Sequence, residues 1–497
     1  MLSLLCGRGL EERIDETKTE GEDEQLAKKR MTRREAISTL GKVVIVVSAA
    51  AVIGAATYSA ISRLSKPSPA PRIMTLRYFG AGEISLSSSA VEELKKTAGI
   101  TIERTDSDFF TLAQRLIASR GEGWDVGFTG RLRAIIAAGV IAPIDVSRLP
   151  RWRAEWLTPL IARPESFLGP NYVKRFNQLL WKEVGRQLWA VPMLWNYDSV
   201  GYNPEIVPFE EQGGQSTTVS YGALWDPQYK GKTAMQDEAF TVFSEVANYL
   251  DYHKMLSVSD TVTNLNESEL RQVSDFLKPI LQAGQIKTFW SDFGKIVTLF
   301  ATREIALASC WQPVVFNTRA AGVPCYYARM PEGPFFWWNG DILSVRIPEE
   351  RLDAAYKFFD FQMGPWWANH TAHNGYGIAS PFAPDVRNLM GDEFWGWFYD
   401  GKPTYTPIDQ IIKDTWPDRP EFQGLPERLQ QALFRPEKYF VEGMPPRSGS
   451  PNPKGNLRDL GSIEDKNKIT RYFLSPDFPD NPEAYQQAFS SLKAFMP

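Results

Sequence analysis

The order of strand-like and helix-like segments predicts an α/β fold, in which a mostly parallel sheet is covered by helices on both faces. From residue 73 onward, short stretches with alternating apolar residues are followed by amphipathic stretches with helical spacing. Glycines close several of these helical stretches. With 497 residues, 43% apolar and 23% charged, the chain is long enough for two or more packed lobes.

The first series of elements alternates strand and helix three times. Ligands of such folds bind at the carboxyl ends of the strands, so we expect the site in the loops 80–85, 105–108 and 129–131. In order, we expect a strand over 73–80, a helix over 87–99, a strand over 100–107, a helix over 108–121, a strand over 124–130 and a helix over 131–139.

The pattern resumes after residue 230. A long final helix is expected to break near Gly364-Pro365, because proline removes a helical hydrogen bond. In order, we expect a strand, loop and helix over 231–250, a helix over 267–284, a helix and a strand over 294–311, a helix over 313–322, a strand over 323–333 and the long helix over 349–375.

The N-terminal region predicts export and membrane attachment. Residues 1–29 are polar with mixed charge and are expected to be a disordered cytoplasmic tail. Residues 30–62 combine a basic flank with an uncharged run, 43–62, of the length that crosses a bilayer. The stretch "TRREAIS" resembles a twin-arginine export signal, and a plain secretory signal anchor is the alternative. Residues 63–73 are expected to be a linker outside the cytoplasm, and cleavage of the signal stays open.

Composition excludes several classes of function. The net charge of −4 gives no basic footprint for nucleic acid. Three histidines make a histidine-based metal centre improbable, and no nucleophile triad, phosphate loop or Cys-His metal spacing occurs, so we expect neither an enzyme nor a cofactor. Cys310 and Cys325 could form a disulfide or remain as two buried thiols.

Four sequence blocks resemble those of bacterial extracellular solute-binding proteins, and in particular the spermidine/putrescine-binding group of ABC importers. The blocks keep the order and spacing of that family, and the resemblance covers about residues 74–390. They are "WDVGFTGRLRAIIAAGVIAPID", "LWDPQYKGKTAMQDEA", "ATREIALASCWQPVVFNTRAAGVPCYYARMPEG" and "FFWWNGDIL".

The resemblance implies a type II periplasmic-binding-protein-like fold of two lobes, which close on a ligand like a hinged trap. The first lobe would hold residues 74–194 and 335–497, including a C-terminal extension from residue 391, and the second would hold residues 195–334. The resemblance also implies a monomer that captures a small molecule and delivers it to a membrane permease, with no nucleic-acid partner.

The site residues are carried over from the family one at a time. Trp311 matches a tryptophan that lies along the ligand at the end of a strand. At the second crossing between the lobes, an aromatic ring and a carboxylate match Trp337 or Trp338 and Asp341. The remaining matches are the acids that follow the "YKG" strand and a tyrosine in a loop near the ligand, namely Asp237, Glu238 and Tyr376.

Departures from the family change the expected ligand. Thr241 replaces an acid, Gly80-Ala81 replaces a Trp-Thr pair, and Gly130-Arg131 replaces paired tyrosines. At an effective dielectric constant of about 20, a like charge about 4 Å from an ammonium group costs roughly 4 kcal/mol. Either Arg131 points away from the cleft or the ligand is not a simple polyamine. An amine that also carries a carboxylate, or a betaine-like cation, would tolerate both an aromatic wall and Arg131. We therefore expect a small cationic or zwitterionic organic solute, of which a polyamine is one member. Carboxylates and aromatic faces suit such a solute.

Other interpretations of the same residues stay open. Aromatic runs are often core, and Asp237 and Glu238 could simply cap the following helix. The pair Tyr326 and Tyr327 suggests a ferric-ion or anion site as an alternative. Neighbouring residues of a strand face opposite sides, however, so both hydroxyls could not readily reach one ion. A membrane-anchored sensor is a further alternative.

Overall fold

A computed structural model describes residues 74–207, 211–212, 215–216, 219–321, 323–372, 375–402, 458–472 and 477–496. All of them lie in the second of the two units into which the chain divides, Ser68–Pro497. The predicted tail, signal and linker lie outside the described residues, as does most of the extension after residue 402. Within the described ranges, no helix combines the length and the apolar character needed to span a bilayer.

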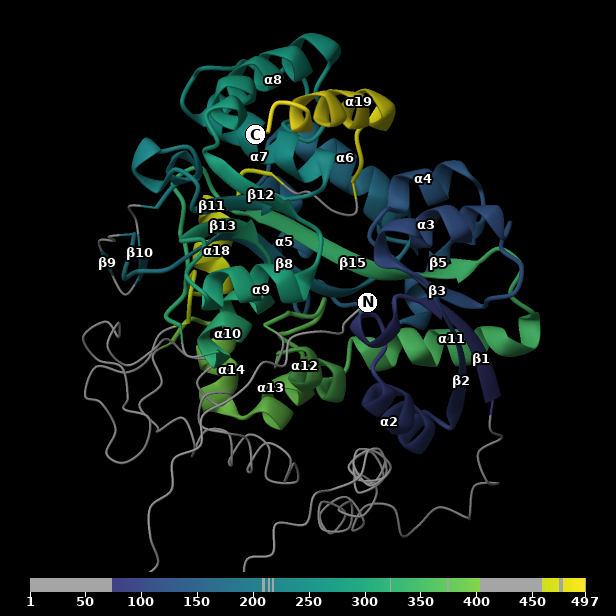
Figure 1. Cartoon of the computed structure of the whole chain (residues 1–497). Helices are drawn as coiled ribbons and strands as arrows, with labels where there is room; N and C mark the ends of the chain where they lie inside the picture. The colour runs from purple at the N-terminus through teal and green to yellow at the C-terminus, as the bar shows by residue number, and fades with distance from the viewer. Residues whose placement is uncertain are drawn as a thin grey trace, which may run out of the picture. The chain divides into compact units, whose positions relative to one another are not determined.

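The described residues form a 10-stranded sheet with the order β12-β11-β13-β8-β15-β3-β1-β2, to which β14 adds at β8 and β4 at β15 (Figure 1). Two small sheets, β5-β7-β6 and β9-β10, complete the strands. The strands are β1 Met74–Gly80, β2 Ile100–Asp106, β3 Val126–Thr129, β4 Ile141–Ala142, β5 Ile144–Asp145, β6 Trp181–Glu183, β7 Gln187–Leu188, β8 Val191–Tyr202, β9 Glu211–Gln212, β10 Gln215–Ser216, β11 Thr233–Gln236, β12 Ile286–Trp290, β13 Leu307–Cys310, β14 Tyr326–Tyr327 and β15 Phe335–Ser344.

Two groups of parallel strands are joined by two long antiparallel strands. In one group β1 pairs in parallel with β2 and β3, and in the other β11 pairs in parallel with β12 and β13. Strands β8 and β15 run antiparallel to each other between the groups, from Phe335 opposite Asp198 to Asp341 opposite Val191. We call the β1–β3 group with its helices the first lobe, and the β11–β13 group with its helices the second lobe. The predicted two-lobed α/β class is confirmed, and the two lobes share one continuous sheet.

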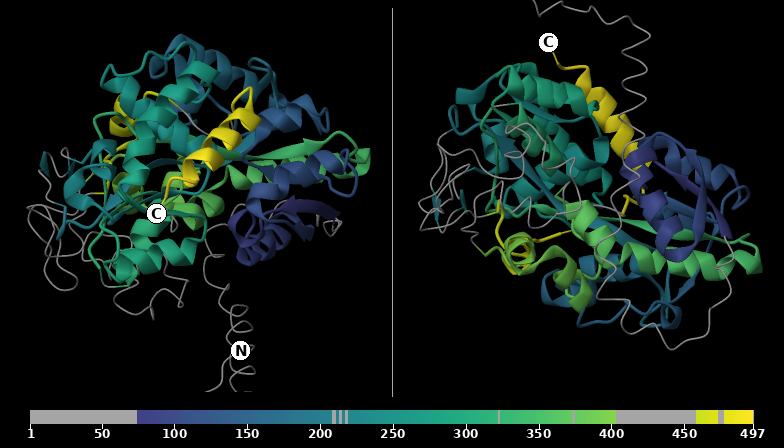
Figure 2. Two further views of the ribbon diagram at one scale, coloured as in Figure 1. Left: turned by 45° about the horizontal axis from the view of Figure 1, so that its top comes forward. Right: turned by 90° about the horizontal axis from the view of Figure 1, so that it is seen from below.

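Helices flank both groups of strands (Figures 1 and 2). The predicted break of the long helix is confirmed, because α11 ends before Gly364 and α12 begins at Pro365. The helices are α2 Ser88–Ala98, α3 Phe109–Ala118, α4 Leu132–Ala137, α5 Pro159–Ala162, α6 Pro170–Leu180, α7 Ala239–Tyr252, α8 Glu267–Gln282, α9 Phe293–Ala301, α10 Gln312–Ala320, α11 Glu349–Gln362, α12 Pro365–Ala372, α13 Pro384–Met390, α14 Asp392–Phe398, α18 Ile463–Ile469 and α19 Pro482–Lys493.

Local sequence signals set the helix ends. Ser87 caps α2 by accepting a hydrogen bond from the Ala90 amide, and Gly99 ends that helix with a φ of 67°. Asn266 and Glu269 form a reciprocal capping box at the start of α8. Ser87 therefore fixes where the loop after β1 ends, and Gly99 fixes where α2 ends before β2.

Two buried apolar clusters fill the structure. The larger one holds Leu76, Phe128 and Ile342 of the first lobe and continues into the second lobe at Phe300. The smaller one, with Val246 and Leu307, lies in the second lobe. The larger core therefore extends across the crossing strands that join the two lobes.

The C-terminal part of the chain packs into both cores. Residues 458–472 bring buried charged side chains into the structure, among them Arg458, Asp459 and Lys466. Helix α19 packs against α7 and α8, although it lies in the range predicted for the first lobe. The predicted lobe boundaries remain predictions.

Candidate functional site

A small pocket opens where β11, β12 and β13 end. It lies at the carboxyl edge of the parallel strands, the position at which open α/β sheets bind ligands. The last residues of β11 and β12, and the residues that directly follow β11, β12 and β13, line this pocket. They are Gln236, Asp237, Glu238, Trp290, Ser291 and Trp311.

Two tryptophans form the apolar wall of this pocket. The rings of Trp290 and Trp311 meet edge to face, with centroids 5.1 Å apart. The indole of Trp290 donates a hydrogen bond to the Ser309 carbonyl at 3.0 Å, which fixes its orientation. Trp311 is partly exposed at the first turn of α10, so its ring can offer an apolar, electron-rich surface to a guest.

Cations of the chain itself engage the two acids of the pocket. Asp237 accepts a hydrogen bond from the Lys493 ammonium at 2.8 Å, and Glu238 pairs with the Arg131 guanidinium at 2.9 Å. The Glu238 carboxylate also caps α7 by accepting from the Thr241 amide at 2.7 Å. The helix-capping interpretation of Glu238 is therefore confirmed, and it coexists with a position at the pocket.

Arg131 brings the two lobes into contact. It follows β3 at the carboxyl edge of the first lobe, whereas Glu238 follows β11 in the second. The side chains of Arg131 and Glu238 in this ion pair are only 17% and 16% exposed. The strand ends of the two lobes thus face each other, which is the geometry of a closed interlobe cleft.

A second polar group lies where β8 and β15 cross between the lobes. The indole of Trp337 donates to the Asp198 carboxylate at 2.8 Å, and the rings of Trp337 and Tyr376 meet at 5.6 Å. Cys310 at the end of β13 pairs with Ser199 of β8, so the following residue, Trp311, comes level with Asp198. Trp337 and Tyr376 therefore lie beside Asp198, and Trp311 directly follows the strand that pairs with the Asp198 strand.

Burial makes Asp198 an unusual acid. Only 4% of it is exposed, and this burial raises the pKa of its carboxyl group to about 8, against the opposing effect of the Trp337 hydrogen bond. A second buried acid, Glu245 of α7, also has its pKa raised by burial. The charge of Asp198 adds to the effect of burial in raising the pKa values of three weakly acidic groups, namely Cys310, Tyr327 and Tyr376.

The sequence analysis did not single out Asp198. The signal that could have found it is a carboxylate inside the stretch "VPMLWNYDSVGY", in which every residue of the strand is buried. Burying an ionisable carboxyl group without a neighbouring base lowers the stability of the fold, so such a residue is a candidate for a functional role.

Two predicted cleft residues lie elsewhere, and the prediction is corrected for them. Trp338 is fully buried and contacts the ring of Phe176. Asp341 is also fully buried, in the first lobe beside β3, where it accepts a hydrogen bond from Tyr78 at 3.1 Å. The pairing of β8 with β15 shifts by one residue between Asn339 and Gly340, where β8 has an extra residue, Met193, and Asp341 lies beyond this shift, opposite Val191.

The arrangement does not favour the metal alternative. No group of three or more His, Cys, Asp and Glu side chains suited to a metal ion occurs within the described ranges. The Tyr327 hydroxyl donates a hydrogen bond to the Cys310 carbonyl at 2.7 Å and accepts one from the Ser199 amide. This hydroxyl is therefore hydrogen-bonded to the backbone of two strands, β13 and β8. Cys310 and Cys325 are both buried free thiols.

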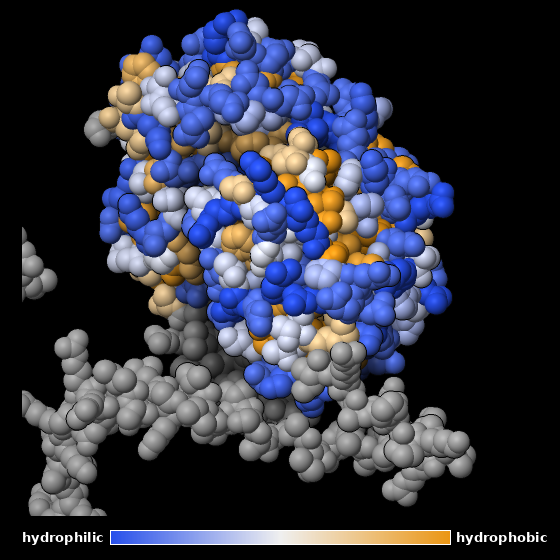
Figure 3. All heavy atoms as spheres, turned by 90° about the vertical axis from the view of Figure 1, so that its right-hand side faces the viewer, coloured by the Kyte–Doolittle hydropathy of each residue, from blue (hydrophilic) through white to orange (hydrophobic). Residues whose placement is uncertain are grey.

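A larger open depression lies at the opposite ends of the first-lobe strands. Its lining includes Ile117, Val140 and Val345, with Arg120 and Arg346 at its edge. These residues precede the parallel strands or follow the antiparallel β15, so the depression lies away from the ligand-binding edge. The face at the right of Figure 1 is mainly hydrophilic, with apolar side chains gathered near its middle (Figure 3).

Two lobes that share crossing strands and close on a pocket define the class of hinged solute-binding proteins. The chain belongs to the family of bacterial extracellular solute-binding proteins, whose family profile matches residues 89–397. The predicted family is thereby confirmed.

Characterised relatives are similar over part of their length. The spermidine/putrescine-binding periplasmic protein of Salmonella typhimurium is 25% identical over 229 residues, which cover 46% of this chain and 58% of the relative. The putrescine-binding periplasmic protein PotF of Escherichia coli is 22% identical over 293 residues, which cover 56% of this chain and 71% of the relative. This chain thus spans under three fifths of the first relative. Both are named as binding proteins, in agreement with the prediction that this chain is not an enzyme.

A solved structure shows the same fold. It is that of a candidate spermidine/putrescine ABC transporter protein from Listeria monocytogenes, with a TM-score of 0.51 and 15% sequence identity, covering 85% of this chain and 99% of that one.

Proposed function

We propose that this protein is the extracytoplasmic substrate-binding component of an ABC importer, and that it captures a small cationic or zwitterionic organic solute between its lobes. The observation that carries the proposal is the buried Asp198 carboxyl group beside Trp337 and Tyr376 and level with Trp311. Polyamines are one member of the proposed ligand class, and the names of the relatives support them.

The chemistry of this group suits an organic cation. An ammonium group is stabilised by a carboxylate and by the faces of aromatic rings, and both interactions strengthen when water is excluded. Asp198 supplies the carboxylate, and the three aromatic residues supply apolar surface for methylene or methyl groups. Arg131 at the facing edge would pair with a carboxylate of a zwitterionic guest once it is released from Glu238.

The remaining parts of the proposal concern place and partner. The segment 43–62 would hold the binding protein at the outer face of the membrane, where a permease receives the solute. A monomer is sufficient for this role, because both walls of the pocket come from one chain.

Ligand binding to the full-length chain tests the proposal. Calorimetric titration with spermidine, putrescine, glycine betaine, a neutral amino acid and ferric ion should give a saturable signal for at least one organic cation or zwitterion. Trp311→Ala should weaken that binding by about 2- to 30-fold, the range of a cation–π contact. Asp198→Asn should weaken it at least about tenfold, because it removes the paired charge.

Asp353→Asn is the control for Asp198→Asn, because it makes the same chemical change at an exposed ion pair with Arg148, outside the proposed site. It should bind like the wild type. Binding of ferric ion alone, with an affinity that survives Trp311→Ala and Asp198→Asn, would contradict the proposed site.

The affinity should also depend on pH. With a pKa of about 8, the Asp198 carboxyl group is mostly neutral in the empty protein at pH 7, and a cationic guest binds the ionised form. The association constant should therefore rise by about tenfold per pH unit between pH 6 and 7.5. Titrations across this range should lose most of the slope in Asp198→Asn, and an equal slope in both proteins would exclude Asp198 as the linked group.

A further inference from the structure

The C-terminal segment 477–496, which we call the strap, is fixed to the second lobe by aromatic packing. The Tyr485 ring contacts Phe243 of α7 at 5.6 Å, and its hydroxyl accepts a hydrogen bond from the Leu265 amide at 2.6 Å. Phe489 meets Phe289 of β12 at 5.0 Å. In Figures 1 and 2, α19 lies beside α7 and α8, and its N-terminal end is directed toward the helices of the first lobe.

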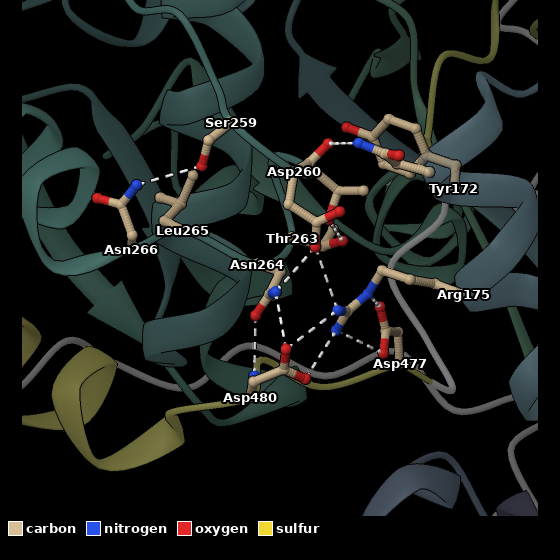
Figure 4. Close-up of polar contacts among 12 residues, drawn as sticks. Tyr172, Arg175, Ser259, Asp260, Thr263, Asn264, Leu265, Asn266, Asp477 and Asp480 are labelled. Atoms are coloured by element: carbon tan, nitrogen blue, oxygen red, sulfur yellow. Dashed lines mark hydrogen bonds and ion pairs between the residues drawn. The ribbon is translucent and has the colours of Figure 1, made fainter.

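The start of the strap reaches the first lobe through a buried carboxylate. The Asp477 side chain is fully buried and accepts hydrogen bonds from Arg133 of α4, at 2.7 and 2.8 Å, and from Arg175 of α6, at 2.7 Å. Asp480 extends this network, because it lies between Arg175 and Asn264 (Figure 4). The strap therefore connects helices that belong to different lobes.

Two strap side chains lie directly at the facing strand ends. The ring of Phe478 packs on Phe240 at 5.4 Å, and the Arg131 guanidinium covers this ring at 4.7 Å. At the other end of α19, the Lys493 ammonium contacts the pocket acid Asp237 at 2.8 Å. Together with the Arg131–Glu238 pair, this contact means that both acids of the pocket are already neutralised by cations of the chain.

We propose that the strap is a built-in competitor of the guest. The strap ties the lobes together through Asp477 and occupies Asp237 with the Lys493 ammonium. A cationic guest that extends from Asp198 past Trp311, which also lines the pocket of Asp237, displaces that ammonium and loosens α19. The part of the proposal that concerns displacement rests on the proposed function. The part that concerns closure of the lobes does not depend on any guest.

Hydrogen exchange in the full-length chain without guest tests closure. Lys493→Gln should speed amide exchange at the end of α19 and over 237–243. Asp480→Asn, a milder change than Asp477→Asn, should speed exchange over 170–180, the helix that carries Arg175. Lys287→Gln is the matched control, because its ammonium makes a similarly exposed ion pair with Glu304 outside the pocket. Exchange that stays at wild-type rates in Lys493→Gln and Asp480→Asn would overturn the proposal.

Titration with spermidine tests displacement. Lys493→Gln should bind spermidine about 2- to 5-fold more tightly than the wild type, the range of an exposed ion pair, and Lys287→Gln should not. Saturating spermidine should speed exchange of residues 482–493. Equal binding by wild type and Lys493→Gln, without faster α19 exchange, would overturn the strap and leave cation binding intact. If no organic cation binds any variant while the guest-free changes occur, the strap stands as a closure device and the proposed ligand class fails.

Discussion

Replacing Asp459 by Asn is expected to lower the free energy of unfolding by about 3–5 kcal/mol, because it leaves a buried guanidinium without its counter-charge. Asp459 pairs with Arg319 of α10, and both side chains are at most 2% exposed. The same guanidinium donates to the Cys325 carbonyl at 2.6 Å, so the arginine is held in place and cannot turn to water. Chemical denaturation at pH 7 measures the effect.

The matched control for this prediction is Asp392→Asn. Asp392 also pairs with an arginine, Arg387, but its side chain is 81% exposed. We expect a loss of less than about 1 kcal/mol there, as for surface ion pairs in general. Equal losses in the two variants would contradict the conclusion that residues 458–472 are an integral part of the core.

Asp341→Asn is expected to change how stability depends on pH. Burial raises the pKa of the Asp341 carboxyl group to about 8, although its hydrogen bonds with Gln362 and Tyr78 oppose the shift. Between about pH 4 and pH 8 the unfolded chain has lost this proton and the folded chain keeps it. The stabilising contribution is therefore complete below about pH 4 and is lost as pH rises, by about 1.4 kcal/mol per unit.

The comparison with the asparagine variant isolates this group, because asparagine keeps the shape of the neutral acid and does not titrate. Unfolding free energies measured at pH 5, 6 and 7 should shift in favour of Asp341→Asn by about 1.4 kcal/mol per unit. The raised pKa of Asp198 also makes the free energy of unfolding fall as pH rises, but this contribution is the same in the wild type and in Asp341→Asn. A difference that stays constant with pH would show that Asp341 is ionised in the folded protein.

Part of the candidate site follows from the sequence by a simple rule. Asp237, Glu238 and Trp311 come directly after short apolar strands. The ends of parallel strands share one edge of a sheet, so such residues gather there wherever the sheet forms. The structure brings these three residues to one pocket.

The positions of Asp198, Trp338 and Asp341 could not be predicted in the same way. A fully buried strand has no apolar–polar alternation that would reveal which face meets the cleft. The facing side is set by the pairing of β8 with β15, which lie more than 130 residues apart, and by the register shift at Asn339. A shift of one residue moves a side chain to the other face of the sheet.

By itself, the sequence determined the α/β class, the capped ends of α2 and the break between α11 and α12, since these depend on residues within one or two turns of each other. Only the tertiary structure decided which acids line the pocket and which cations neutralise them. The Lys493–Asp237 contact joins residues 256 positions apart, and Asp477 meets Arg133 across 344 positions. Pairs at such separations form only when packing of the apolar cores brings their elements together, because charges in the unfolded, hydrated chain attract one another too weakly to select a partner.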